Sequence, residues 1–158
     1  LKFTGSTTLA SSAISTGKVI QTVSATGGAE LMTSSTFNST GLYATITPTA
    51  ATSRLLVFAT TPRIYNNGTE ELNAQIWKGT SGEASGSTVQ GLRSDGGGFS
   101  GNTDSPATMS VLIPASGVTT AATTFTVMHA NGNNSSLVGW YQGLTGAQGE
   151  LIIMEISA

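Results

Sequence analysis

Residues that could perform acid–base or metal chemistry are few and scattered in this sequence. His129 is the only histidine and cysteine is absent, so neither paired imidazoles nor a thiolate set can hold a transition metal. Glu70 and Glu71 are neighbours in β-rich sequence, where adjacent side chains point to opposite faces, so they cannot flank one glycosidic bond. No serine lies in a G-x-S-x-G elbow. We therefore predict that the protein is not an enzyme and uses no cofactor.

His129 itself fits a structural role. On its expected strand it alternates onto the same side as Phe125 and Val127, which are both apolar. A catalytic triad would need the fold alone to bring an acid and a serine to it. We interpret His129 as a hydrogen-bonded histidine of the core or of an interface.

The glycine-rich stretch at residues 94–104 formally contains the G-x-G-x-x-G pattern of a dinucleotide site. Such a site needs a helix N-terminus directly after the glycines, and residues 102–106 (NTDSP) offer no helix. Asp95 and Asp104 flank the stretch and have the oxygen ligands that Ca²⁺ prefers. Two carboxylates nine residues apart equally suit solubilising loop charges, so we predict no metal site.

Aromatic residues beside amides are the more informative pattern. Flat apolar rings match the CH faces of sugars, and amides donate to and accept from sugar hydroxyls. The alternative is structural, because Trp77 and Trp140 also suit a core or an interface. The candidate ligand-binding residues, all in expected loops or at strand ends, are Tyr65, Asn66, Asn67, Phe99, Asn131, Asn133, Trp140 and Tyr141.

The overall composition is that of a weakly charged, hydroxyl-rich domain. Only 9% of the 158 residues are charged, whereas about 25% is usual, and 38% are apolar in short alternating runs that indicate a packed core. The net charge of −2 and six scattered cations make nucleic acid an unlikely partner by charge. No apolar run approaches the roughly 18 residues needed for membrane insertion. The start lacks the apolar stretch of a signal peptide, so we expect a processed product or a piece of a longer protein.

Alternation with a period of two predicts a series of short strands. In the stretch 41–62, residues 42–47 alternate apolar and polar side chains, and residues 55–58 are apolar on both faces, as in a central strand. We expect these two strands to form a hairpin-like pair. A second hairpin is expected at residues 65–68, because Asn-Gly between β-rich runs is a strong hairpin signal. The expected strands are residues 18–25, 31–37, 42–47, 55–58, 72–77, 88–93, 106–114, 123–130, 137–142 and 151–156.

These elements predict an all-β fold with essentially no helix. An antiparallel β-sandwich of jelly-roll type is expected, with residues 1–17 as an extended N-terminal arm or linker and 18–158 as the domain. Residues 55–58 and 151–156 are apolar on both faces and require more cover than one sandwich provides. A subunit interface would supply that cover, so we expect a symmetric homo-oligomer, with a trimer as the candidate.

Three stretches carry a family resemblance. They are Gly17-Lys18-Val19-Ile20-Gln21, residues 40–59 (TGLYATITPTAATSRLLVFA) and the terminal residues 151–158 (LIIMEISA). Together they resemble the C-terminal domain of tailed-bacteriophage fibre proteins. Members of that group often run G-K-V-L-Q, a Thr-Gly-Leu strand, an I-T-P turn, an aliphatic strand and a short L-M-E-I strand. Residues 60–150 match only in general character, with Gly, Asn and Ser loops between short strands.

The resemblance implies a component of the virion surface, usually a homotrimer, whose β-sandwich head touches the host surface. It implies contact with other virion proteins through the arm and with host glycans through loops, and it supplies no catalytic motif. The alternative in the same setting is a trimeric capsid decoration protein or head fibre with a structural role. A polysaccharide-cleaving enzyme is the alternative from another class, and its usable acids here are few and dispersed.

Overall fold

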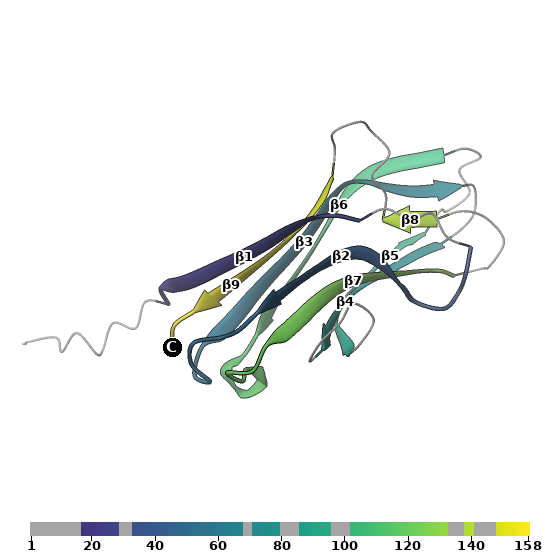
Figure 1. The fold of residues 1–158 in the computed structure, drawn as a ribbon. Coiled ribbons are helices and arrows are strands. Elements are labelled where there is room, and N and C mark those ends of the chain that lie inside the picture. Colours follow the sequence, from purple (N-terminus) through teal and green to yellow (C-terminus); the bar gives the residue numbers. More distant parts are fainter. Residues whose placement is uncertain are drawn as a thin grey trace, which may run out of the picture.

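The structure is a computed structural model that describes residues 17–28, 33–67, 71–79, 86–95, 102–132, 138–140 and 148–158. Its elements are almost entirely strands (Figure 1), and the helical part of the described chain is one short 3-10 turn at Ala115–Gly117. This confirms the all-β class. The strands are β1 (Val19–Gly27), β2 (Asn38–Ile46), β3 (Arg54–Asn67), β4 (Glu71–Gly79), β5 (Ser87–Asp95), β6 (Asn102–Ile113), β7 (Thr123–Asn131), β8 (Val138–Trp140) and β9 (Gly149–Ile156).

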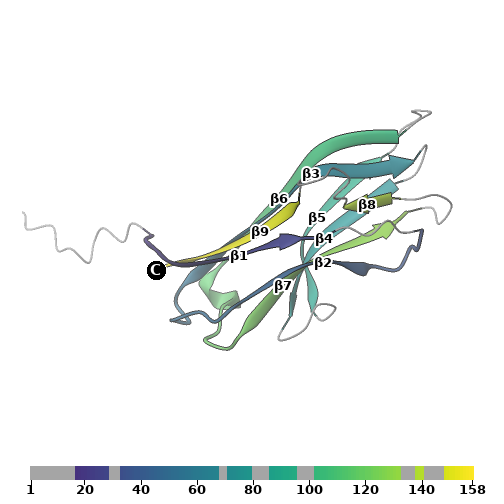
Figure 2. The same ribbon diagram turned by 45° about the horizontal axis from the view of Figure 1, so that its top comes forward.

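The strands form two antiparallel sheets that face each other as a β-sandwich. The first sheet has the order β1-β9-β3-β6, with β8 paired to the far part of β3, and the second has the order β2-β7-β4-β5. The turned view in Figure 2 shows the same two layers, with β2 and β7 in one and β1 and β9 in the other. The prediction that residues 55–58 form a central strand is confirmed, because β3 is internal to its sheet, and the strand expected at residues 151–156 is β9, which is internal as well.

The core lies between the inward faces of the two sheets. Along β3 the residues alternate between buried and half-buried, and Leu55 and Val57 are fully enclosed. They share one cluster with Phe125 and Val127 of the other sheet and with Ile153 of β9. Full burial of each such side chain contributes roughly 1.5–3 kcal/mol relative to exposure. The period of two in the sequence therefore assigns each strand an inward face.

Both expected hairpins are wrong. β3 and β4 flank the Asn-Gly turn, yet they belong to different sheets, and β2 and β3 are likewise separated. β3 pairs with β6, β8 and β9 instead. A turn residue reverses the chain but does not choose the partner, and each of these strands buries its apolar face by crossing to the opposite layer.

Several strand boundaries also differ from expectation, and β3 extends to Asn67 where a strand was expected over 55–58. Residues 33–37 are outside any strand, although a strand was expected over 31–37, and residues 29–32 lie outside the described part. Pro106, which we placed at the start of a strand, lies within β6. β6 is an edge strand, where a residue without an N–H can be accommodated.

A buried carboxylate fastens one end of the sandwich. Glu155 of β9 is 0% exposed and accepts hydrogen bonds from the Gln21 side chain at 2.6 Å and from the Thr49 N–H and hydroxyl at 2.9 and 2.8 Å. The Ala50 N–H adds a longer bond of 3.3 Å. This single group thereby joins β9, β1 and the turn between β2 and β3.

The donors keep this carboxylate ionised. Burial raises the pKa of Glu155, but Ser53, Gln21 and Thr49 outweigh burial and lower the pKa to about 2 from an ordinary 4.5. The Ser53 hydroxyl contributes to this lowering although it makes no hydrogen bond of good geometry to the described residues. The contribution of Glu155 to stability is therefore fully present above pH 4.5 and is lost as the pH falls toward 2.

We predict that Glu155→Gln lowers the free energy of unfolding at neutral pH by roughly 1.5–3 kcal/mol, the usual value of hydrogen bonds to a charged group. Urea titrations at several pH values measure this directly. The variant should also lose less stability than the wild type between pH 4.5 and 2. Glu150→Gln is the matched control, since it removes the same charge from the half-buried face of the same strand. Equal stability of Glu155→Gln and wild type would contradict the assignment.

Candidate functional site

The structure brings several predicted ligand-binding residues together at one end of the first sheet. Tyr65 and Asn66, near the end of β3, lie opposite Gly139 and Val138 of β8, and Trp140 lies opposite Ile64. On the other side of β3, Tyr65 lies opposite Asp104 of β6. Asn67, the last residue of β3, pairs with Asn102. Figure 1 shows that this end of the sheet is remote from the C-terminus.

Of the other predicted residues, the structure describes Asn131 alone. Phe99, Asn133 and Tyr141 lie outside the described residues. Asn131 is at the end of β7 and is 1% exposed, with its N–H donating to the Ser34 carbonyl at 2.8 Å. A side chain so deeply buried is out of reach of a ligand at the surface.

The two weak metal candidates are placed in different sheets. Asp95 of β5 pairs with Glu71 of β4, whereas Asp104 pairs with Tyr65. Within the described ranges no three Asp, Glu, His or Cys residues gather as metal ligands. The residues that follow the glycine-rich pattern form strand β6 rather than a helix, as the sequence predicted.

His129 belongs to the core. It is 1% exposed in β7, on the same side as Phe125 and Val127, and this burial lowers its pKa to about 4 from 6.5. The imidazole is therefore neutral at neutral pH. The sequence left two structural roles open for His129, in the core or in an interface, and the core role is confirmed.

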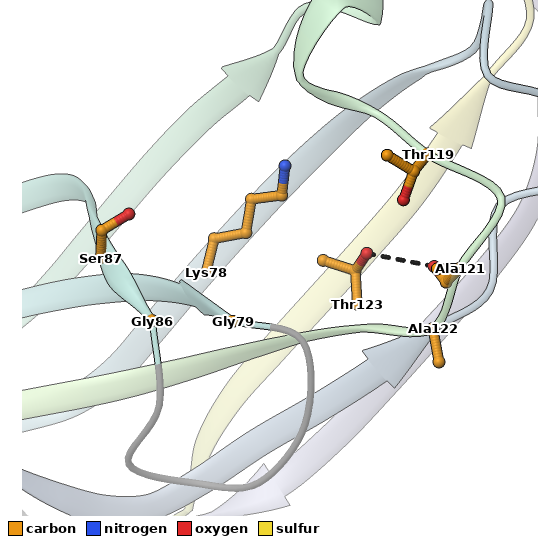
Figure 3. Close-up of a pocket in the computed structure, with 8 residues that line it drawn as sticks. All are labelled: Lys78, Gly79, Gly86, Ser87, Thr119, Ala121, Ala122 and Thr123. Carbon is orange, nitrogen blue, oxygen red and sulfur yellow. Dashed lines mark hydrogen bonds between the residues drawn. The ribbon is translucent and has the colours of Figure 1, made fainter.

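A cavity of about 390 Å³ opens between the end of β4, the start of β5 and the segment before β7 (Figure 3). Lys78 supplies its charge, and the Lys78 ammonium donates to the carbonyl of Gly117. Thr123 donates to the carbonyl of Ala121 at 3.2 Å. The described lining residues include no carboxylate, imidazole or thiol. The cavity offers hydrogen-bond donors and one positive charge, but no acid–base pair.

A further group of side chains forms what we call the aromatic platform, on the outward side of the second sheet. Tyr43 and Trp77 both lie opposite Thr126, from the strands on either side of β7. The ring centroids of Phe37 and Trp77 are 6.1 Å apart with a tilt of 44°. β7 lies between β2 and β4, and its outward-facing Thr126 and Met128 are both 1% exposed. The platform consists of Phe37, Tyr43, Gln75, Trp77 and Thr88.

The polar members of the platform are held in fixed positions. The Gln75 carbonyl oxygen accepts from the Trp77 indole N–H at 2.7 Å and from the Thr88 hydroxyl at 2.6 Å. Tyr43 is 45% exposed, while Phe37 and Trp77 are half-buried. The rings therefore keep surface available to a ligand, next to an ordered amide.

The sequence contained a signal for this platform. Trp77 follows Asn73 and Gln75 in the polar set of its strand, and Tyr43 stands in the polar set of β2. Alternation thus placed both aromatic residues on outward faces. That they share one face became visible only with the pairing of β2 and β4 to β7.

The chain matches no protein-family model, and no curated protein is significantly similar to it. The resemblance to phage fibre domains therefore remains a prediction. Of the described residues, no helix is long and apolar enough to span a membrane. Function must be argued from the fold and its surfaces.

We predict that stability falls as the pH drops from 6.5 toward 4, because the unfolded chain binds a proton at the imidazole that the folded chain excludes. The lowered pKa of His129 corresponds to a loss of about 3 kcal/mol in the free energy of unfolding between pH 6.5 and 4. Urea unfolding of wild type and His129→Gln measures it, and the variant should show a flatter pH dependence. The window is diagnostic because the chain has one histidine. An unchanged slope in the variant would refute the prediction.

Proposed function

We propose that the protein is the head domain of a virion fibre, a non-enzymatic structural protein that assembles as a homotrimer on the particle surface and contacts host-cell glycans. The observation that carries this proposal is the apolar outward face of the β1-β9-β3-β6 sheet. A binding role also fits the cavity and the platform, which offer donors and rings rather than an acid–base pair.

The outward face of this sheet is apolar across neighbouring strands. Leu56 of β3 lies between Leu112 of β6 and Met154 of β9, and Phe58 lies beside Ile152. Leu112 is 48% exposed, and so is Val19, which pairs with Ile156. The remaining members are half-buried. The apolar face consists of Val19, Leu56, Phe58, Leu112, Ile152, Met154 and Ile156.

Contiguous apolar surface of this kind is uncommon on a soluble monomer and marks interfaces. A second copy of the chain is the natural cover, because closed symmetric oligomers are the usual form of soluble assemblies. Each aliphatic side chain removed from water adds to association at about 25 cal/mol per Å². The outward-facing apolar side chains of β3 and β9 are thus the physical reason to propose the trimer.

The strand order supports the finer proposal of a jelly roll. The chain passes from β1 to β4 by changing sheet at each step, and the final strand β9 inserts between β1 and β3. This interleaving is what two Greek keys wrapped into a sandwich produce. Viral capsid and lectin domains are among the proteins that use the jelly roll.

The two ends of the sandwich suit attachment and contact. Near residue 17, the Lys18 N–H donates to the Ser157 hydroxyl at 3.0 Å, so the chain enters beside its C-terminus. The β3–β8 end, with Tyr65 and Trp140, is the opposite one (Figure 1). An arm at residues 1–17 that joined other virion proteins would leave this far end directed away from the particle.

We predict that the wild type has the mass of three chains in sedimentation velocity and that Val19→Lys/Leu112→Lys dissociates it. Both positions are exposed in one subunit, so the subunit should still fold. The lysines remove apolar contact and add like charges, which should raise the dissociation constant by at least about a hundredfold.

Tyr43→Lys is the matched control, because Tyr43 is similarly exposed but lies on the other sheet. A monomeric wild type, or a double variant that stays assembled, would contradict the proposed interface. Binding of the labelled trimer to intact bacterial cells then separates the alternatives. A fibre head should bind cells of some strains, whereas a capsid decoration protein should bind none.

A further inference from the structure

We infer that the aromatic platform is a binding site for a neutral saccharide. This inference rests on the proposed contact with host glycans and locates that contact on a sheet face rather than in the strand-end loops. It follows from the ring geometry, from an unused amide donor, from the absence of charge and from one buried hydroxyl without a partner.

The rings are spaced to contact more than one sugar residue. Tyr43 and Trp77 stand opposite the same residue, Thr126, from the two neighbours of β7. Their backbones are therefore about 10 Å apart, twice the spacing of adjacent strands. Aromatic faces bind the CH surfaces of sugars, and two such faces at fixed spacing suit an extended oligosaccharide better than a single small molecule.

The Gln75 amide is oriented by its neighbours. An indole N–H can only donate, so the atom that meets Trp77 at 2.7 Å is the Gln75 oxygen, and Thr88 occupies the second acceptor position of the same oxygen. The amide nitrogen keeps both its hydrogens, and it makes no hydrogen bond to the described residues. A sugar hydroxyl beside Trp77 would accept from it.

The platform has no formal charge at neutral pH. Its five members are three aromatic residues, an amide and a hydroxyl. It therefore has no cation to pair with a carboxylate or phosphate, and the available contacts are ring stacking and neutral hydrogen bonds. These contacts suit a neutral saccharide better than an acidic one.

The Thr126 hydroxyl is the independent sign of an incomplete site. Thr126 is 1% exposed, and among the described residues its hydroxyl oxygen has no hydrogen-bond partner. Leaving such a group unpaired costs roughly 1–3 kcal/mol, and native proteins leave few of them. It lies between Tyr43 and Trp77, the two residues that a saccharide would engage.

The test uses the assembled full chain and a panel of neutral oligosaccharides of several hexoses, with matched uronic-acid oligosaccharides. Binding is followed by tryptophan fluorescence in a Trp140→Phe background, where Trp77 is the remaining tryptophan. We expect neutral members to bind and uronic-acid members to bind at least about tenfold more weakly. Tyr43→Ala and Gln75→Ala should each weaken binding about tenfold by saturation-transfer NMR.

Two matched variants separate the platform from other sites. Tyr43→Phe keeps the ring and should stay within about twofold of wild type. Tyr65→Ala tests the strand-end group and should leave saccharide binding unchanged. Circular dichroism and unfolding midpoints verify that each variant is folded, and the 45% exposure of Tyr43 makes loss of folding unexpected there.

Three results would overturn the inference. The first is no binding of any neutral oligosaccharide at about 10 mM. The second is binding that Tyr65→Ala removes and Tyr43→Ala does not. The third is protection of Tyr43 and Trp77 from hydroxyl-radical labelling in the saccharide-free oligomer, which would make the platform a subunit contact. A trimer that binds cells but no saccharide refutes this inference alone, whereas a monomer refutes the proposed function.

Discussion

The whole structure depends on the face-to-face packing of the inward sides of its two sheets. Leu55 and Val57 of one sheet and Phe125 and Val127 of the other lie in a single buried cluster. Once these side chains face inward, the period of two in every strand fixes which residues face out. A shift of one residue in β3 would move Leu55 and Val57 out of the core and turn the half-buried Leu56 and Phe58 inward. The outward faces are therefore set by the same packing that stabilises the fold.

The strands could be predicted from the sequence because alternation is a local property. Residues 55–58 were identified as a central strand and residues 151–156 as a strand with two apolar faces from their own side chains, and β3 and β9 are internal to their sheet. Strand partners could not be predicted in this way. Leu56 pairs with Leu112 and Met154, which lie far later in the chain, and no turn signal encodes those distances. Hence the Asn-Gly signal was misinterpreted as a hairpin, because it does not specify which strands pair.

The same limit applies to the sites. The neighbours of Tyr65 along the chain suggested an aromatic and amide cluster. The pairing of β3 with β8 then places Trp140 opposite Ile64, beside this cluster. Alternation places Tyr43 and Trp77 in the polar sets of their strands, but their shared face depends on a third strand, β7. Glu155 looked like the polar end of an apolar strand. Its role needs donors from Gln21 and Thr49, which only the folded chain brings to it.

The two outward faces differ in polarity, which favours a subunit interface on the first sheet and a ligand site on the second. The apolar members of the face with Leu56 and Met154 extend across neighbouring strands, so burying them against another copy removes apolar surface from water. The platform contains an amide with unused donors. A dry protein interface would leave these donors without hydrogen-bond partners, at a cost of roughly 1–3 kcal/mol each. A saccharide replaces the water at such donors with its own hydroxyls, so the polar face stays paired on binding. In a trimer that buries the aliphatic faces, three platforms would point outward together, and weak single contacts would add up by avidity.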